Sequence, residues 1–375
     1  MKLRKVLSLA MVCSMIAGTA MFSQPAQAED LEGVNAFIFK ASGIRFGELL
    51  YDGFVQYMDE MGEPTVFKAG AETTVSAQVE LLDELITQNV KSITIACCGE
   101  TGYDQVFKKA QEKGITIVSV DAKASPDYRI VHTGQASTET IGRQQVQMGV
   151  LISLGIDYPE DGDMRAAVEK ALADYDGEPL TLGVLSGAVD SPVQNGWIAY
   201  MEEELADDIY QGKVNPLDIK YGNDDMPEST IQANAFLAEG KVNVIIAPTT
   251  VGIMAAGQVL SSSGSDVKVT GIGIPSEMAS FMPAKPEDNA FDFVCPYMEM
   301  WDLYHFGATA AAATYAALYD GFTGEAGESF TMHAYGDYDE AVYEAYEIDD
   351  GGTEVLQGEP LVFTKDNMAT WVELM

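Results

Sequence analysis

The 375-residue sequence is poor in cysteine and histidine, and this scarcity excludes two classes of protein. It has 4 cysteines, and those that follow residue 28 are Cys97, Cys98 and Cys295, an odd set that is no disulfide framework. The adjacent pair follows an apolar run and is typical of small buried residues. The 3 histidines stand alone, whereas a metal site needs spaced cysteines and histidines. We therefore predict no metal and no other cofactor.

Positive charge is also scarce. The sequence carries 21 Lys+Arg against 58 Asp+Glu, a formal net charge of −37. Such a surface repels phosphate backbones and anionic lipid headgroups, so neither nucleic acid nor a membrane surface is an expected partner. The acidity is typical of a surface that stays soluble in a salty medium, and it says little about a ligand.

No long apolar run occurs after the first 28 residues. Within them, a basic start (Lys2, Arg4 and Lys5) precedes the apolar stretch Val6–Phe22 and a small-x-small site ending at Ala28. This pattern predicts a secretory signal peptide over 1–28, cleaved after Ala28. A membrane anchor is the alternative, but glycine, threonine and serine interrupt a run already short for a span. We expect an exported protein, periplasmic or extracellular.

Signatures of nucleotide binding and of hydrolysis are missing. The stretch "KASGIRFG" has its lysine at the wrong end for a phosphate loop, and in "GIGIPS" Pro275 stands where a dinucleotide-binding fold begins a helix. No Gly-x-Ser-x-Gly elbow is present, and Asp121 lacks the second carboxylate that a glycosidase uses. We predict no enzymatic activity, with a secreted carbohydrate-active enzyme as a remaining alternative.

What the sequence does contain, from residue 33 on, is an alternation of short apolar runs and amphipathic segments. Near-continuous apolar strands separated by helices are typical of a parallel sheet covered on both faces. The arrangement restarts at "LTLGVLSG", so an α/β protein with two doubly wound parallel-sheet lobes is predicted. The predicted helices are Glu48–Met61, Val75–Gln88, Tyr103–Lys113, Gln194–Leu205, Glu228–Glu239, Thr250–Leu260 and Glu299–Tyr319.

We interpret the segments after residue 275 as places where the chain returns to each lobe. The predicted N-terminal lobe is 29–134 plus 276–333, and the C-terminal lobe is 135–275 plus 334–375. Within the second lobe, 157–179 is acidic and weakly periodic, which indicates a surface insertion.

Polar residues follow several of the predicted strands, at the edge where open α/β sheets bind ligands. Lys40 follows the first strand, Asp121 follows the fourth, and Gln194 and Asn195 open a helix in the second lobe. Charged and amide groups bind hydroxyls while aromatic faces cover C–H surfaces, so the set suits a neutral polyhydroxylated ligand.

Each of these residues has a simpler interpretation. Asp121 could cap a turn and Lys40 could be a solvated charge. Gln194 and Asn195 could be helix-start residues, and the tryptophans, Trp301 among them, could be core residues.

Motifs along the whole chain resemble those of type I periplasmic solute-binding proteins of the ribose-binding class, most closely the rhamnose- and autoinducer-2-binding branch. The resemblance is carried by "FIFKASGIRFG", "TTVSAQVELLDELITQNVKSITIA", "GITIVSVDAKA", "VQNGW", "VNVIIAPTTVG", "MWDLYHFG" and "YEIDDGGTEVLQGEPLVFTKDN". It implies two Rossmann-like lobes joined by a hinge of three crossovers, with a ligand clamped between them. It also implies a monomer that delivers this ligand to an ABC permease in the membrane.

In the autoinducer-2 branch that the chain resembles, a lysine, an aspartate, a glutamine and a proline contact the ligand, and they match Lys40, Asp121, Gln194 and Pro248. Two positions differ from the pattern of this branch: Val193 stands where an acidic residue is expected, and Thr250 stands where a small residue is expected. The resemblance therefore implies a ligand that is a rhamnose-like or other monosaccharide, or autoinducer-2. A receptor subunit that presents this ligand to a membrane sensor or chemotaxis system is the alternative function. The predicted ligand-binding residues are Lys40, Phe46, Asp121, Gln194, Asn195, Pro248, Thr250, Trp301 and Asp302.

Overall fold

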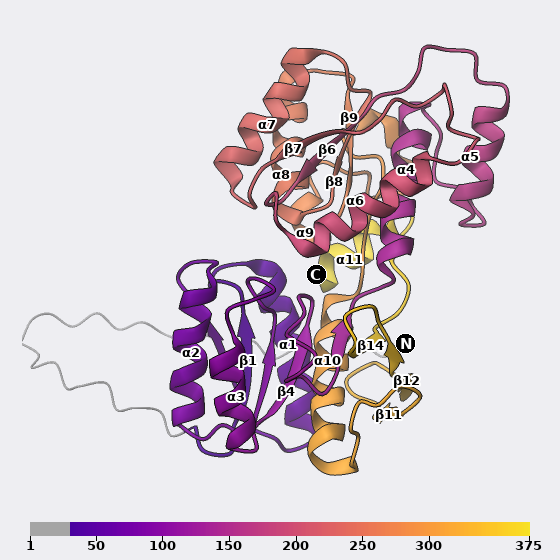
Figure 1. Ribbon diagram of the computed structural model, residues 1–375. Helices are drawn as coiled ribbons and strands as arrows, with labels where there is room; N and C mark the ends of the chain where they lie inside the picture. The colour runs from indigo at the N-terminus through magenta and orange to yellow at the C-terminus, as the bar shows by residue number, and fades with distance from the viewer. Residues whose placement is uncertain (1–30) are drawn as a thin grey trace, which may run out of the picture. The chain divides into compact units, whose positions relative to one another are not determined.

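The computed structural model describes residues 31–375, so the predicted signal peptide and its cleavage site lie outside the described residues. The described chain builds a seven-stranded sheet and a four-stranded sheet, both flanked by helices (Figure 1). The predicted α/β class with doubly wound parallel sheets is confirmed.

The first sheet has the strand order β13-β14-β5-β4-β3-β1-β2. Neighbouring strands run parallel except for the edge pair β13–β14. Parallel neighbours bring their carboxyl ends to one edge of the sheet. The strands are β1 (Asn35–Phe39), β2 (Thr65–Ala69), β3 (Ser92–Ile95), β4 (Thr116–Val120), β5 (His132–Gly134), β13 (Tyr346–Glu347) and β14 (Thr353–Leu356).

The fully buried strand β1 shows how one apolar run supplies two cores. Successive side chains of a strand point to opposite faces of a sheet. Phe37 and Phe39 pack in the core beneath α1 and α10, whereas Ala36 and Ile38 pack in the core beneath α2 and α3. The helices concerned are α1 (Arg45–Glu60), α2 (Val75–Thr87), α3 (Asp104–Glu112) and α10 (Leu303–Tyr315).

Helices α1 and α10 lie side by side although they are far apart in the sequence (Figure 1). Their backbones approach closely because glycine occupies the contact on both. A Cβ atom at Gly53 would overlap the carbonyl group of Tyr304, and one at Gly307 would overlap that of Leu50. The two helices therefore pack as one layer on the first sheet.

The second sheet has the order β7-β6-β8-β9 with parallel neighbours throughout. A bridge between Ile272 and Glu299 adds β10 beside β9, and β15 pairs antiparallel with β10. Figure 1 shows α4, α5 and α6 grouped together and α7 beside α8. The strands are β6 (Leu182–Ser186), β7 (Asp218–Tyr221), β8 (Val244–Ala247), β9 (Lys268–Gly271), β10 (Met298–Met300) and β15 (Leu361–Phe363). The helices are α4 (Thr138–Ser153), α5 (Met164–Ala173), α6 (Pro192–Leu205), α7 (Met226–Glu239), α8 (Thr250–Ser263), α9 (Pro275–Met278) and α11 (Met368–Leu374).

The remaining elements are short. The strands β11 (Ser329–Met332) and β12 (Ala341–Glu344) pair antiparallel. The turn η1 (Ala290–Asp292) precedes β10, and η2 (Ala316–Asp320) extends α10. Between Leu31 and Met375, no helix has the length and apolarity that crossing a membrane requires.

Helix boundaries follow from capping residues in the sequence. Thr74, Ser137 and Asp225 each accept a hydrogen bond from a backbone N–H in the first turn of the following helix, which pairs a group the helix leaves free. Gly240 and Gly264 end α7 and α8 in the left-handed conformation that glycine adopts easily. Six of the predicted helices accordingly begin within about one turn of their observed starts.

The seventh predicted helix, Glu299–Tyr319, begins too early. Met298–Met300 is strand β10, since it pairs with β15. The helix begins only at Leu303, because the Asp302 side chain accepts a hydrogen bond from the backbone N–H of His305 and caps it.

The segment 157–179 is more ordered than a surface insertion suggests. It contains α5, whose Met164, Val168 and Leu172 are buried. These three residues recur every fourth position, a stripe too narrow to stand out in an acidic segment.

Strand pairing assigns the late segments differently from the predicted lobe boundaries. The sequence placed 276–333 in the first lobe and 334–375 in the second. In the structure β10 joins the second sheet, whereas β14 pairs with β5 of the first. The division into lobes stays a prediction. We propose that the chain crosses near residue 301 and again between β14 and β15.

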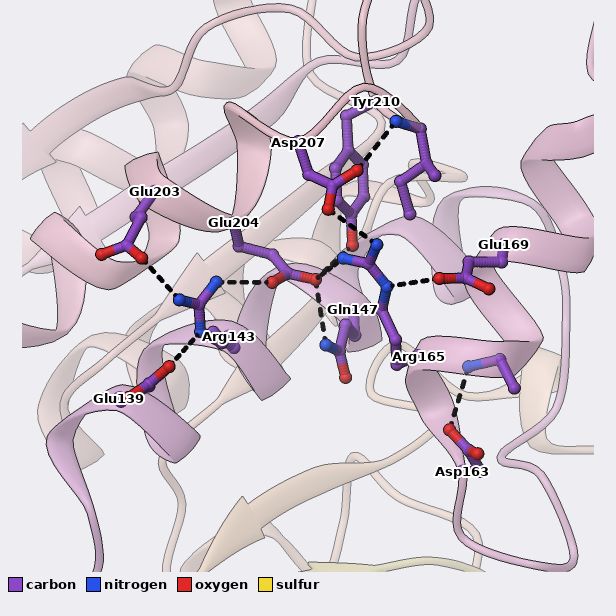
Figure 2. A network of polar contacts seen from close by, with 12 residues as sticks. Glu139, Arg143, Gln147, Asp163, Arg165, Glu169, Glu203, Glu204, Asp207 and Tyr210 are labelled. Atoms are coloured by element: carbon purple, nitrogen blue, oxygen red, sulfur yellow. Dashed lines mark hydrogen bonds and ion pairs between the residues drawn. The ribbon is translucent and has the colours of Figure 1, made fainter.

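A buried carboxylate joins α4, α5 and α6 (Figure 2). Glu204 is 1% exposed and accepts hydrogen bonds from Arg143, Arg165, Gln147 and Tyr210 at 2.6–3.2 Å. Burial alone would raise the pKa of this carboxyl group, but the four donors hold it below its usual value. Glu204 is therefore an ionised group inside the protein, and its partners fix three helices together.

Candidate functional site

The site is built from the carboxyl ends of β1 and β4. Lys40 directly follows β1 and Asp121 directly follows β4, with β3 between the two strands. The distance between Lys40 Nζ and Asp121 Oδ2 is 2.7 Å, which makes the two side chains an ion pair with a hydrogen bond. The predicted convergence of these two residues at one edge of the sheet is present in the structure.

Asp121 has an uncommon backbone conformation. Its φ of 61° lies in the left-handed region, which costs energy for residues other than glycine and recurs at functional sites. Its carboxylate is 9% exposed and accepts from Lys40, and no backbone N–H of residues 31–375 donates to it. The simpler interpretation of Asp121 as a turn cap is therefore not supported by its contacts.

The charge of Lys40 is stabilised from both sheets. Burial alone would lower the pKa of the ammonium group, but the charge and hydrogen bond of Asp121 raise it, and Asp224 raises it further. Lys40 is thus protonated at neutral pH. Its side chain remains 27% exposed, so it can still reach a molecule in solution.

Two cysteines lie beside this lysine. Cys97 and Cys98 follow β3, and Cys98 Sγ lies 3.5 Å from the backbone carbonyl oxygen of Lys40. Both thiols are unpaired, and burial raises the pKa of Cys97 to about 12 and that of Cys98 to about 11. They are therefore protonated thiols at neutral pH and serve as packing residues.

In the second sheet, Gln194 and Pro248 lie together. Gln194 Nε2 donates to the Pro248 carbonyl oxygen at 3.4 Å, and its Oε1 accepts from Ser191 Oγ. The amide is partly exposed, and its long bond to Pro248 leaves it free to exchange this partner for a ligand. Thr250 is the first residue of α8, two positions after Pro248.

Asn195 takes a local role instead. Its Nδ2 donates to the Val189 carbonyl oxygen at 3.0 Å, which closes the loop before α6. The structure thus favours the simpler interpretation of Asn195 as a helix-start residue.

The aromatic candidates form a chain of contacts around Trp301. Its ring centroid lies 6.1 Å from that of Phe46 on α1 and 6.2 Å from that of Trp197 on α6. Trp301 is 1% exposed, so it is a core residue by burial. Its Nε1–H is nevertheless buried without an acceptor among the described residues. Buried polar groups are nearly always paired, so this N–H is available to an acceptor.

Asp302 is already fully engaged. Its Oδ1 accepts from the His305 backbone N–H at 3.1 Å, and its Oδ2 accepts from the Tyr338 hydroxyl at 2.6 Å. The carboxylate thus anchors the start of α10 and joins it to the loop that carries Tyr338.

The sequence analysis missed Asp224. This residue follows β7 in "LDIKYGNDD", and its carboxylate contributes to the raised pKa of Lys40. The signal was the same as for the other candidates, a polar residue beyond an apolar strand. This signal was weak because β7 is only half-buried and contains Lys220, so it does not stand out as an apolar run.

Among the described residues, neither a surface hollow nor a metal-ligand cluster provides an alternative binding site. Hollows of about 440 and 340 Å³ lie on other parts of the surface, and neither includes Lys40 or Asp121. No group of three or more potential metal ligands occurs in residues 31–375.

Comparisons with known proteins give one family model and several solved structures that this chain resembles. A family model described as a periplasmic binding protein domain matches residues 35–321. An ABC transporter solute-binding protein from Clostridium phytofermentas, solved with bound L-rhamnose, is 30% identical with a TM-score of 0.77, and the match covers 92% of this chain and 99% of that one.

Two further solved structures share the fold at lower identity. LsrB from Clostridium saccharobutylicum, in complex with AI-2, is 20% identical with a TM-score of 0.73 over 90% of this chain and 99% of that one. A sugar ABC transporter protein from Actinomyces odontolyticus is 24% identical with a TM-score of 0.65 over 90% and 97%.

Proposed function

Because the chain belongs to the periplasmic binding protein family, we propose that it is an exported solute-binding protein of an ABC-type importer. It captures a small polyhydroxylated ligand and passes it to a permease in the membrane. The role is binding and not catalysis, in line with the solute-binding proteins that it resembles.

The observation that carries this proposal is the ion pair of Lys40 and Asp121. The two groups stand at strand ends where α/β folds bind ligands, and they are joined at 2.7 Å while remaining in reach of solvent. A lysine that donates and a carboxylate that accepts can together bind adjacent hydroxyl groups of one molecule.

We assign ligand contacts to the groups that keep a free or exchangeable position. Lys40, Asp121 and Gln194 bind hydroxyls, Pro248 offers its carbonyl oxygen, and Phe46 covers C–H surface. Three other predicted residues receive supporting roles: Asn195 and Asp302 hold local structure, and Trp301 packs behind the site. Thr250 places its backbone at the start of α8.

A neutral monosaccharide is the ligand class we propose, with L-rhamnose as the first candidate. The L-rhamnose-bound protein is the one with 30% identity, whereas the AI-2-bound LsrB is 20% identical. Val193 is partly buried against the apolar core, so it supplies no carboxylate beside Gln194. A diol-rich ligand that relied on an acid at this position would leave hydroxyl groups unpaired, at a cost of about 1–3 kcal/mol.

A thermal-shift screen tests the proposal. The purified protein is heated with L-rhamnose, D-arabinose, D-allose or AI-2. A ligand that binds only the folded state stabilises the protein, by about 2.7 kcal/mol at a ligand concentration one hundred times Kd. The melting temperature rises as a result. No shift with any sugar or with AI-2 would contradict a solute-binding role.

The substitution Val193→Asp separates the two ligand classes. In a sugar-binding protein it places an unpaired charge beside the site and should weaken binding of L-rhamnose. Recovered affinity for AI-2 in this variant would instead favour AI-2 as the ligand class.

A further inference from the structure

Asp224 lies in a strained turn at the carboxyl end of β7. Its φ is 51° and that of Asn223 is 55°, so two consecutive residues other than glycine adopt the left-handed conformation. Such residues cost energy and persist where the surroundings hold them. Here the Gly222 backbone N–H donates to the Ser186 carbonyl oxygen at 2.8 Å, and that of Asn223 donates to Gly187 at 3.1 Å. The end of β6 thereby fixes the position of Asp224.

The carboxylate of Asp224 is held on one side only. Its Oδ1 accepts a hydrogen bond from Thr249 Oγ1, at the end of β8. Its Oδ2 lies over Gly187, where a Cβ atom would approach it to 2.9 Å. No side chain or backbone N–H among residues 31–375 donates to Oδ2, and Asp224 is exposed. One carboxylate oxygen is therefore oriented and free.

A second unpaired group lies at the same strand ends. Ser186 closes β6 and is fully buried, and its hydroxyl has no hydrogen-bond partner within the described chain. Unpaired buried hydroxyls are uncommon in native proteins. Gln194, at the same edge, has partners in Ser191 and Pro248. Asp224 thus presents a free carboxylate oxygen at the carboxyl edge of the second sheet.

Asp224 lies beside the predicted ligand-binding residues of the second sheet, because Thr249, which donates to it, directly follows Pro248, the hydrogen-bond partner of Gln194. Asp121 pairs with Lys40 from the first sheet, and Asp224 acts on the same ammonium group from the second. Two carboxylates share one cation, so the local charge is negative. Such a site attracts hydroxyl donors and repels a carboxylate or phosphate on the ligand.

We propose that Asp224 is the ligand-binding carboxylate of the second sheet, that its Oδ2 accepts a hydroxyl hydrogen of the sugar, and that the ligand is restricted to neutral sugars. This inference rests on the proposed function, because it deepens the same site. It adds a contact that neither Gln194 nor Val193 can supply.

Calorimetric titration with L-rhamnose tests the contact, using wild type, Asp224→Asn and Asp224→Ala. Asparagine tolerates the left-handed backbone, so the first variant removes the charge without adding strain. Both variants should weaken binding at least about tenfold, since a charge-assisted hydrogen bond is lost. Melting temperatures of all variants check that they are folded.

Asp225→Asn is the matched control. Asp225 caps α7 by accepting from the Glu228 backbone N–H at 2.9 Å, and asparagine caps equally well. This variant removes one negative charge from the neighbouring residue and should bind within about twofold of wild type.

The outcomes separate the two proposals. Wild-type affinity in both Asp224 variants, with L-rhamnose binding intact, overturns the role of Asp224 and leaves the solute-binding function standing. If wild type binds neither L-rhamnose nor any sugar of the screen, both proposals fall. Displacement of L-rhamnose by D-galacturonate at comparable concentrations overturns the restriction to neutral sugars.

Discussion

Lys40 and Asp121 are 81 residues apart in the sequence, and their side chains meet at 2.7 Å. The side chains of Lys40 and Asp121 are 27% and 9% exposed, so the cost of removing both charges from water offsets much of their attraction, and the pair adds little net stability. The left-handed backbone at Asp121 costs energy in addition. The pair is therefore better explained by what it binds than by what it stabilises.

The first prediction concerns this pair. Asp121→Ala and Lys40→Ala should each weaken binding of the sugar by about 2–4 kcal/mol, because a charged hydrogen-bonding partner is lost from the site. Titration calorimetry measures the loss of affinity, and unfolding in urea checks that each variant is folded at the temperature of the titration.

The ion pair of Asp83 and Lys109, at 2.5 Å on the exposed faces of α2 and α3, provides the control. Asp83→Ala removes a similar contact far from the strand ends and should leave affinity unchanged. Unchanged affinity in both Asp121→Ala and Lys40→Ala would mean that the site lies elsewhere.

The second prediction concerns Glu204. Glu204→Ala leaves the arginines Arg143 and Arg165 without their shared buried partner, so it should destabilise the protein by about 3–5 kcal/mol. Glu203 is its matched control, because it pairs with Arg143 at 2.6 Å but is exposed. Glu203→Ala should cost about 0–1 kcal/mol in the same urea titration. Equal losses would show that burial is not what matters.

The third prediction concerns Glu299 on β10. Its side chain is fully buried, and neither oxygen has a hydrogen bond of normal geometry. Burial raises the pKa of this carboxyl group well above its usual value, and the Gln145 amide offsets this only partly. The folded protein therefore holds the proton more tightly than the unfolded chain does.

The contribution of protonated Glu299 to the free energy of unfolding should be fully present below the pKa of this carboxyl group in the unfolded chain, about 4.3. It should decline as the pH rises toward the pKa in the folded protein, by at most about 1.4 kcal/mol per pH unit. Glu299→Gln carries no ionisable proton and should decline less. Urea titrations from acidic to mildly alkaline pH compare the two proteins, and parallel profiles would contradict a protonated Glu299.

The fourth prediction concerns export. The protein recovered from the periplasmic or secreted fraction should begin at Glu29, because the small-x-small pattern ends at Ala28. Mass spectrometry of the intact protein measures this directly. A retained leader, or a lipid on Cys13, would contradict the prediction.

Much of the fold can be predicted from local sequence patterns. Apolar runs such as Asn35–Phe39 predict the buried strands. Because parallel strands end at a common edge, the sequence also predicts that Lys40 and Asp121 lie close together. Both results depend on short-range periodicity and on the common edge of parallel strands. Neither requires knowledge of distant contacts.

Other features of the fold depend on contacts between residues that are far apart in the sequence. Met298–Met300 is a strand because it pairs with the distant segment Leu361–Phe363 and forms a bridge to Ile272. The bond between Tyr338 and Asp302 likewise joins residues 36 positions apart, and Tyr338 belongs to a separate hairpin. Pairing over such distances leaves no periodic trace in the sequence.

The ring contacts of Trp301 give the protein an internal optical reporter. Phe46 reaches Trp301 from α1 on the first sheet, and Trp197 reaches it from α6 on the second. Any rotation of one sheet against the other must change these ring distances. Indole emission depends on such surroundings, so the intrinsic fluorescence of the protein should change on binding a sugar that itself absorbs no ultraviolet light. Trp371, which packs on Phe363, contributes to the same emission.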